Sequence, residues 1–148
     1  MCGHEITPKP RGGALAALIR PMQHEGLAVQ GDLVFHCPGS PKSMTATHMR
    51  LTPSGDIASH DYCQNYIVVI HEMGDLSRDV GECGHFCEFP LQQPSLGTTA
   101  PEIDIALSRP VALEVSNEGI IGRRVSLYST STLSDRRLVA EGIIGFNI

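Results

Sequence analysis

The sequence predicts a mainly β protein: one antiparallel β-sandwich or barrel of about seven or eight short strands, with one short N-terminal helix. Three observations predict it. Several segments alternate apolar and polar residues, clusters of Gly, Pro, Ser and Asn separate these segments, and 148 residues are enough to bury one core. An α+β arrangement is the alternative.

The first residues are expected to form an arm followed by a helix. Residues 1–12 are polar and interrupted by prolines, so we expect a flexible arm there and a single domain over residues 13–148. Residues 14–20 are rich in Ala and Leu, with aliphatic side chains at helical spacing, and Pro21 follows them. This pattern predicts a short helix that ends at the proline.

Two strands and a tight turn are predicted next. Residues 27–36 alternate, with Leu33 and Phe35 on the same face, and residues 44–51 are rich in Thr, which favours strands. Residues 52–55, Thr-Pro-Ser-Gly, have the composition of a tight turn. We therefore expect the chain to fold back here as a hairpin with the strand that follows.

That following strand, residues 62–71, is the expected centre of the sheet. Its middle, residues 66–70, is apolar on both faces, which indicates a strand that is covered on both sides. Residues 72–101 show no regular alternation of apolar and polar residues, so a long loop is expected there. Within it, a helical turn at residues 75–79 and a short strand at residues 83–89 are local possibilities. Residues 72–88 contain five acidic residues, so much of the negative charge lies in this loop.

Regular alternation returns towards the C-terminus. Strands are predicted at residues 103–107 and 111–115, with a joint at residues 109–110, and at residues 121–132 and 138–148. In the strand predicted at residues 121–132, Val125 and Leu127 are expected to face inward. The pentapeptide Glu-Gly-Ile-Ile-Gly occurs at residues 118–122 and again at residues 141–145, which we interpret as two strands of one meander.

Composition limits the function classes. The net charge of −5 argues against a nucleic-acid or anionic-membrane surface, because both need concentrated Lys and Arg. The apolar runs are far shorter than the ~20 residues that cross a bilayer. Five cysteines, an odd number, fit a reducing compartment, so we expect a cytoplasmic protein.

A cluster of cysteines and histidines, which are possible metal ligands, lies within residues 60–87. Cys83, His85 and Cys87 form a dense group, with His71 and His60 upstream. Thiolates and imidazoles are the ligands that zinc selects, but a regular strand would place alternate residues ~6.6 Å apart, so a bend at the intervening glycine would be required. The alternative is that the cysteines are small buried apolar residues and the histidines are hydrogen-bonded.

Three functions are compatible with these observations. No catalytic or nucleotide-binding motif is present, which favours a non-enzymatic β-domain that binds a protein partner or assembles with itself. The second hypothesis is a small zinc or transition-metal protein, or a hydrolase, that uses the Cys and His cluster. The third is a carrier of a small apolar ligand.

Overall fold

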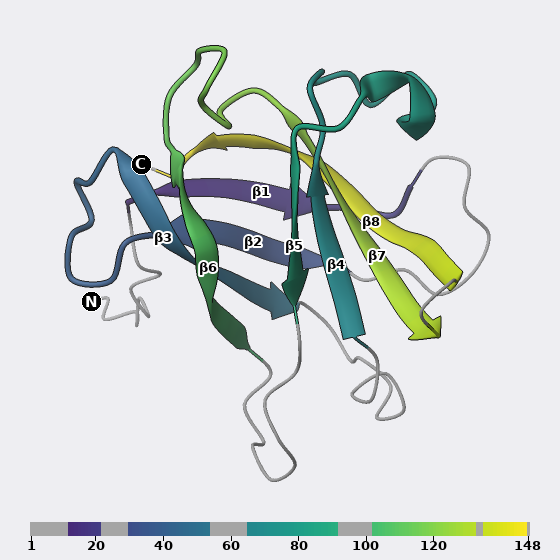
Figure 1. Cartoon of the computed structure of the whole chain (residues 1–148), viewed down its shortest axis with the longest axis horizontal. Helices are drawn as coiled ribbons and strands as arrows, with labels where there is room; N and C mark the ends of the chain where they lie inside the picture. The colour runs from purple at the N-terminus through teal and green to yellow at the C-terminus, as the bar shows by residue number, and fades with distance from the viewer. Residues whose placement is uncertain (1–11, 22–29, 54–64, 92–101, 133–134, 148) are drawn as a thin grey trace, which may run out of the picture.

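Eight antiparallel strands form one sheet that curls into a nearly closed barrel (Figure 1). The structure, a computed structural model, describes residues 12–21, 30–53, 65–91, 102–132 and 135–147. The strands are β1 (Ala14–Leu18), β2 (Gly31–His36), β3 (Thr45–Pro53), β4 (Asn65–Ile70), β5 (Cys87–Leu91), β6 (Ile103–Ala112), β7 (Arg124–Thr132) and β8 (Asp135–Phe146), with the 3-10 helix η2 (Val80–Cys83) before β5. The predicted mainly β fold with about seven or eight strands is confirmed.

The strand order divides the barrel into two halves. The order is β5-β4-β7-β8-β1-β2-β3-β6, so β8 joins the half made of β5, β4 and β7 to the half made of β1, β2, β3 and β6. The two outer strands, β5 and β6, each pair with one neighbour and face each other where the sheet almost closes. Consequently the described barrel is open between β5 and β6.

The core fills the inside of the barrel. Alternate residues of each strand point inward, as predicted for the pairs Leu33 with Phe35 and Val125 with Leu127. The largest fully buried apolar side chains come from nearly every strand: Phe35, Phe89, Leu33, Met49, Leu51, Ile70, Leu91, Leu127 and Ile144, together with Ile120 from a loop. Burial of this apolar surface is the main contribution to stability.

The predicted helix at residues 14–20 is wrong, because Ala14–Leu18 forms β1. Ala14, Ala16 and Leu18 are buried and the residues between them are more exposed, which is a period of two. This strand has β2 on one side and β8 on the other. Backbone pairing on both edges therefore overrides the helical preference of the alanines.

The predicted hairpin at residues 52–55 is also wrong as a pairing. β3 pairs with β2 and β6, whereas β4 pairs with β5 and β7, so the two strands on either side of the turn signal are not neighbours. Residues 54–64 lie outside the described part of the chain. The turn residues indicated a change of direction without specifying the strand partner.

The strand predicted to be central, β4, does lie between two others. Val68 and Ile70 face the core, and Val69 on the opposite face is buried as well. The region that was expected to be a long loop, residues 72–101, contains η2 and the regular strand β5, close to the short strand suggested there. Residues 92–101 lie outside the described residues.

The C-terminal region differs from prediction in two places. β6 runs continuously through the expected joint, although its register with β3 breaks between Ala46 and His48. β7 begins only at Arg124, so the first pentapeptide, residues 118–122, lies in a turn and only the second, residues 141–145, belongs to a strand. The interpretation of both copies as strands is therefore wrong.

No helix in the described ranges is long and apolar enough to cross a membrane.

Candidate functional site

The predicted metal ligands that the structure describes have separate surroundings. Cys87 faces the barrel core, and burial raises the pKa of its thiol. His85 is exposed and its Nε2 lies 3.1 Å from a carboxylate oxygen of Glu88. Cys83 is buried at the end of η2, and His71 is buried just after β4.

These residues do not form a preassembled metal site. Within the part of the chain that the structure describes, no three or more His, Cys, Asp or Glu side chains are arranged to hold one metal ion. His60 lies outside the described residues, so a site that included it stays a prediction. What the structure does bring together is a different set of polar residues, buried between the outer face of β7 and β8 and the segment of residues 72–84.

His71 is fixed by hydrogen bonds at both ring nitrogens. Nδ1 lies 2.7 Å from the carbonyl oxygen of Gly84, which can only accept, so Nδ1 carries the hydrogen. Nε2 is then the acceptor for the hydroxyl of Ser126, at 2.8 Å. Burial lowers the pKa of His71, and the nearby positive charge of Arg124 lowers it further, so the neutral ring is favoured.

This arrangement has the chemistry of a nucleophile and its base, but it is closed to substrates. A neutral imidazole that accepts from a serine hydroxyl is the pairing by which a base activates that hydroxyl. Ser126, however, is 0% exposed and His71 only 4%. A reacting carbonyl would have to come within ~3–3.5 Å of the serine oxygen. The pair therefore acts as a structural link between the end of β4 and β7.

Beside it lies a buried ion pair. Arg124 Nη2 donates to Glu141 Oε2 at 2.5 Å, and the two side chains are 3% and 2% exposed. Arg124 Nη1 also donates to the carbonyl oxygens of Asp75, at 3.1 Å, and Arg78, at 2.8 Å, and lies 3.5 Å from the sulfur of Cys83. One guanidinium therefore fastens the segment of residues 75–83 onto β7 and β8.

A second arginine holds the neighbouring loop. Arg123 donates to the carbonyl oxygens of Gly119, at 2.6 Å, and Glu72, at 2.8 Å, and to two further carbonyls in the turn at residues 116–117. Its guanidinium also lies 3.9 Å from the ring centroid of Phe86, in a cation-π contact. Side-chain hydrogen bonds thus join the loops at this end of the barrel, in addition to the backbone hydrogen bonds there.

Ser126, Arg124 and Glu141 were not predicted from the sequence as site residues. They occupy alternate, polar positions of β7 and β8, which is the pattern of a strand face turned to solvent. A pocket of about 170 Å³ opens beside the ion pair and is lined by Pro21, Leu76, Ser77, Arg78, Asp79, Val80, Arg124, Leu138 and Glu141. Because Arg124 and Glu141 already neutralise each other, the pair leaves little charge to attract a ligand.

The open line of the barrel carries a second and more apolar feature. The facing edges of β5 and β6, which we call the seam, run side by side (Figure 1). Between them lies a groove of about 290 Å³, lined by Phe89, Pro90, Ile105, Ala106, Leu107 and Ser108. Ile105 and Leu107 are half-buried and pack against the core, so the groove is an opening in the wall beside core side chains.

Comparison of the chain with protein-family models, with curated proteins and with solved structures found no match.

Proposed function

We propose that the chain is a non-enzymatic binding module that takes an extended, mainly apolar peptide segment of a protein partner along the seam. One observation carries this proposal: two strand edges, neither of which has a second neighbour among the described strands, face each other across an apolar groove. Free strand edges offer backbone donors and acceptors to an added strand, and a groove between them supplies a place for its side chains.

The seam is suited to a short segment rather than to unlimited sheet growth. Residues 103–106 of β6 keep a regular register with β3, whereas the register breaks beyond Ala106 and resumes only at Val111. On the other side, Pro90 has no backbone N–H to donate. Irregularities and prolines of this kind limit edge-to-edge association, so specificity would come chiefly from side chains seated against Ile105 and Leu107.

The test is a selection from a random peptide library on the intact protein, followed by fluorescence anisotropy with the enriched peptides. Ala106→Asp places a carboxylate in the groove at an exposed position, so the core should be undisturbed. We expect it to weaken binding at least tenfold. Met44→Asp, at an apolar residue that is 61% exposed away from the groove, is the matched control and should bind as the original protein does.

Two results would refute the proposal. One is that no peptide is enriched over an empty support; the other is that Ala106→Asp and Met44→Asp bind the enriched peptides equally well. Sedimentation velocity of the same proteins tests the related possibility that a second copy occupies the seam, since Ala106→Asp would then shift the protein to monomer.

The metal-protein and ligand-carrier hypotheses are considered separately. Elemental analysis of protein purified without an affinity tag tests the metal hypothesis based on Cys83, His85 and Cys87 with His71 or His60. For the ligand-carrier hypothesis, the interior of the barrel is filled by large buried side chains, which favours the seam over an internal pocket. We also propose a cytoplasmic location, supported by free thiols at Cys37, Cys83 and Cys87.

A further inference from the structure

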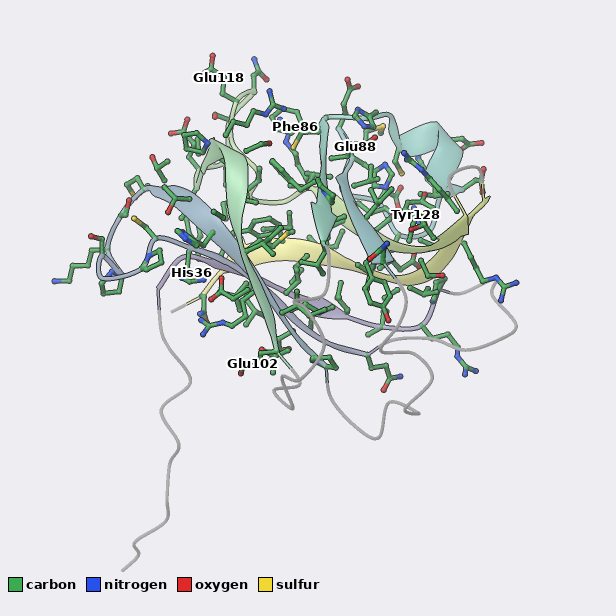
Figure 2. All side chains as sticks on the ribbon, turned by 60° about the horizontal axis from the view of Figure 1, so that its bottom comes forward. His36, Phe86, Glu88, Glu102, Glu118 and Tyr128 are labelled. Carbon is green, nitrogen blue, oxygen red and sulfur yellow. The ribbon has the colours of Figure 1, made fainter. Side chains whose placement is uncertain are left out.

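A cavity of about 380 Å³ lies outside the barrel wall, between the strands β2 and β3 and the loop that follows β2. We call it the outer-face cavity. Three strand side chains and three loop residues form most of its lining: Val34, His36, Arg50, Cys37, Pro38 and Pro41. Figure 2 shows His36 at the end of the molecule away from Tyr128, which lies in β7.

The register of β2 and β3 brings the three strand side chains together. Leu33 and Phe35 face the core, so Val34 and His36, which alternate with them, face outward. Arg50 is the register partner of Val34 on β3 and shares this outer face. Val34 is only 8% exposed although it points away from the core, so other parts of the chain cover this patch of the wall.

The loop that forms the opposite wall is held by backbone contacts. The N–H of Ser40 donates to the carbonyl oxygen of Cys37 at 3.0 Å, which closes a turn. Pro41 packs against Gly12, where a Cβ atom would lie only 2.4 Å from the carbonyl oxygen of Pro41. Prolines restrict the backbone of the loop further. The cavity is therefore shaped in advance, which reduces the entropy that a ligand has to offset.

Arg50 supplies the positive charge at this cavity. Its side chain is half-buried and forms no ion pair or hydrogen bond with another described residue. The carboxylate of Asp104, its register partner on β6, instead lies 3.5 Å from Nε2 of His36, and Asp104 does not line the cavity. Burial lowers the pKa of His36; Asp104 opposes this shift and the charge of Arg50 adds to it, so the neutral ring is favoured. The donors of Arg50 are thus available to an anion.

We propose that the outer-face cavity binds a small carboxylate with an apolar body. The guanidinium of Arg50 takes the carboxylate, because its planar pair of donors matches the two oxygens of that group. Val34, Pro38 and Pro41 contact the apolar body. Ligand pockets of ~300–1,000 Å³ combine mainly apolar walls with a few polar groups in this way. The site is independent of the seam, because the two share no lining residue.

The test uses the full chain in a buffer without carboxylates. Hexanoate is titrated in and followed by calorimetry and by amide NMR shifts. We expect saturable binding that is at least tenfold weaker for hexanamide, which lacks the charge, and for acetate, which lacks the apolar body. Arg50→Gln should weaken hexanoate binding at least tenfold, because the charge is removed and a polar side chain is kept. Arg137→Gln, at an exposed arginine of β8, is the matched control and should bind as the original protein does.

Cys37 gives an independent readout of where the ligand lies. Its free thiol lines the cavity and is partly exposed, so hexanoate should slow its alkylation by iodoacetamide severalfold, measured by mass spectrometry of the peptide that contains it. Arg50 faces outward, so Arg50→Gln should melt near the temperature of the original protein, which separates a lost site from a lost fold. The absence of saturable hexanoate binding would overturn the proposal. So would equal affinity for hexanamide, unchanged affinity in Arg50→Gln, or binding that leaves the alkylation of Cys37 unchanged.

Discussion

Replacing Glu141 by Gln should destabilise the protein by about 3 kcal/mol. Removing one partner of a buried ion pair typically costs about 3–5 kcal/mol, because the remaining charge stays buried without compensation. Both Arg124 and Glu141 are almost fully buried, and Arg124 remains tied to the carbonyls of Asp75 and Arg78, so it cannot easily turn to solvent. The lower end of the range applies, since the new amide oxygen can still accept one hydrogen bond.

Urea unfolding at pH 7 measures this free energy, and thermal unfolding should show a drop of about 6–12 °C for a chain of this length. The repeated pentapeptide provides a matched control. Glu118 holds the same position in the first copy as Glu141 does in the second, but Glu118 is exposed, so Glu118→Gln should change stability by less than about 0.5 kcal/mol. Equal effects of the two substitutions, or a loss below about 1 kcal/mol for Glu141→Gln, would refute the structural role of the pair.

Three further predictions concern the same region. Burial lowers the pKa of His71 below its unfolded value of 6.5, so the unfolded chain binds the proton more readily. Stability should be full above pH 6.5 and fall as the pH drops below it, and urea midpoints of His71→Asn should fall less steeply. Ser126→Ala leaves a buried nitrogen of His71 without its donor and should cost about 1–3 kcal/mol by urea unfolding. Gly74→Ala would push a methyl group to 1.9 Å from the carbonyl oxygen of Gly122 and should cost about 1–3 kcal/mol, whereas Gly145→Ala meets nothing within 4 Å and should be neutral by the same assay.

The fold class could be predicted because strand periodicity is local. Leu33 with Phe35, and Val125 with Leu127, alternate with polar residues, and each pair faces the core. β1 shows where local preference fails. Its alanines favour a helix in isolation, and only the pairing of Ala14 and Ala16 with β2 and β8 makes a strand the better solution.

Strand partners could not be predicted for a related reason. A turn signal such as Thr-Pro-Ser-Gly at residues 52–55 acts over four residues. The strand that pairs with β3 on the side away from β2 is β6, which begins about fifty residues later. Long-range pairing depends on which apolar faces fit together once the sheet curls, and no short pattern encodes that.

The candidate site was only partly accessible from sequence. The region at residues 60–90 does carry His71 and Cys83, yet their described partners are the carbonyl of Gly84, Ser126 and Arg124 rather than one another. The prediction concentrated on residues 60–90 because that segment contains a group of cysteines and histidines. Glu141 and Arg124 were overlooked because an outward-facing polar residue in a strand has the same pattern whether water or another segment covers it.

The position of β8 also determines when the barrel can form. β8 is the last of the described strands and pairs with β1, the first of them, as well as with β7. Closing the contact with β1 joins distant parts of the sequence and should therefore be slow. Until β8 is in place, β1 and β7 each have an unpaired edge in addition to those at β5 and β6. During synthesis the polypeptide would therefore pass through a stage in which two half-sheets are open to association with other chains.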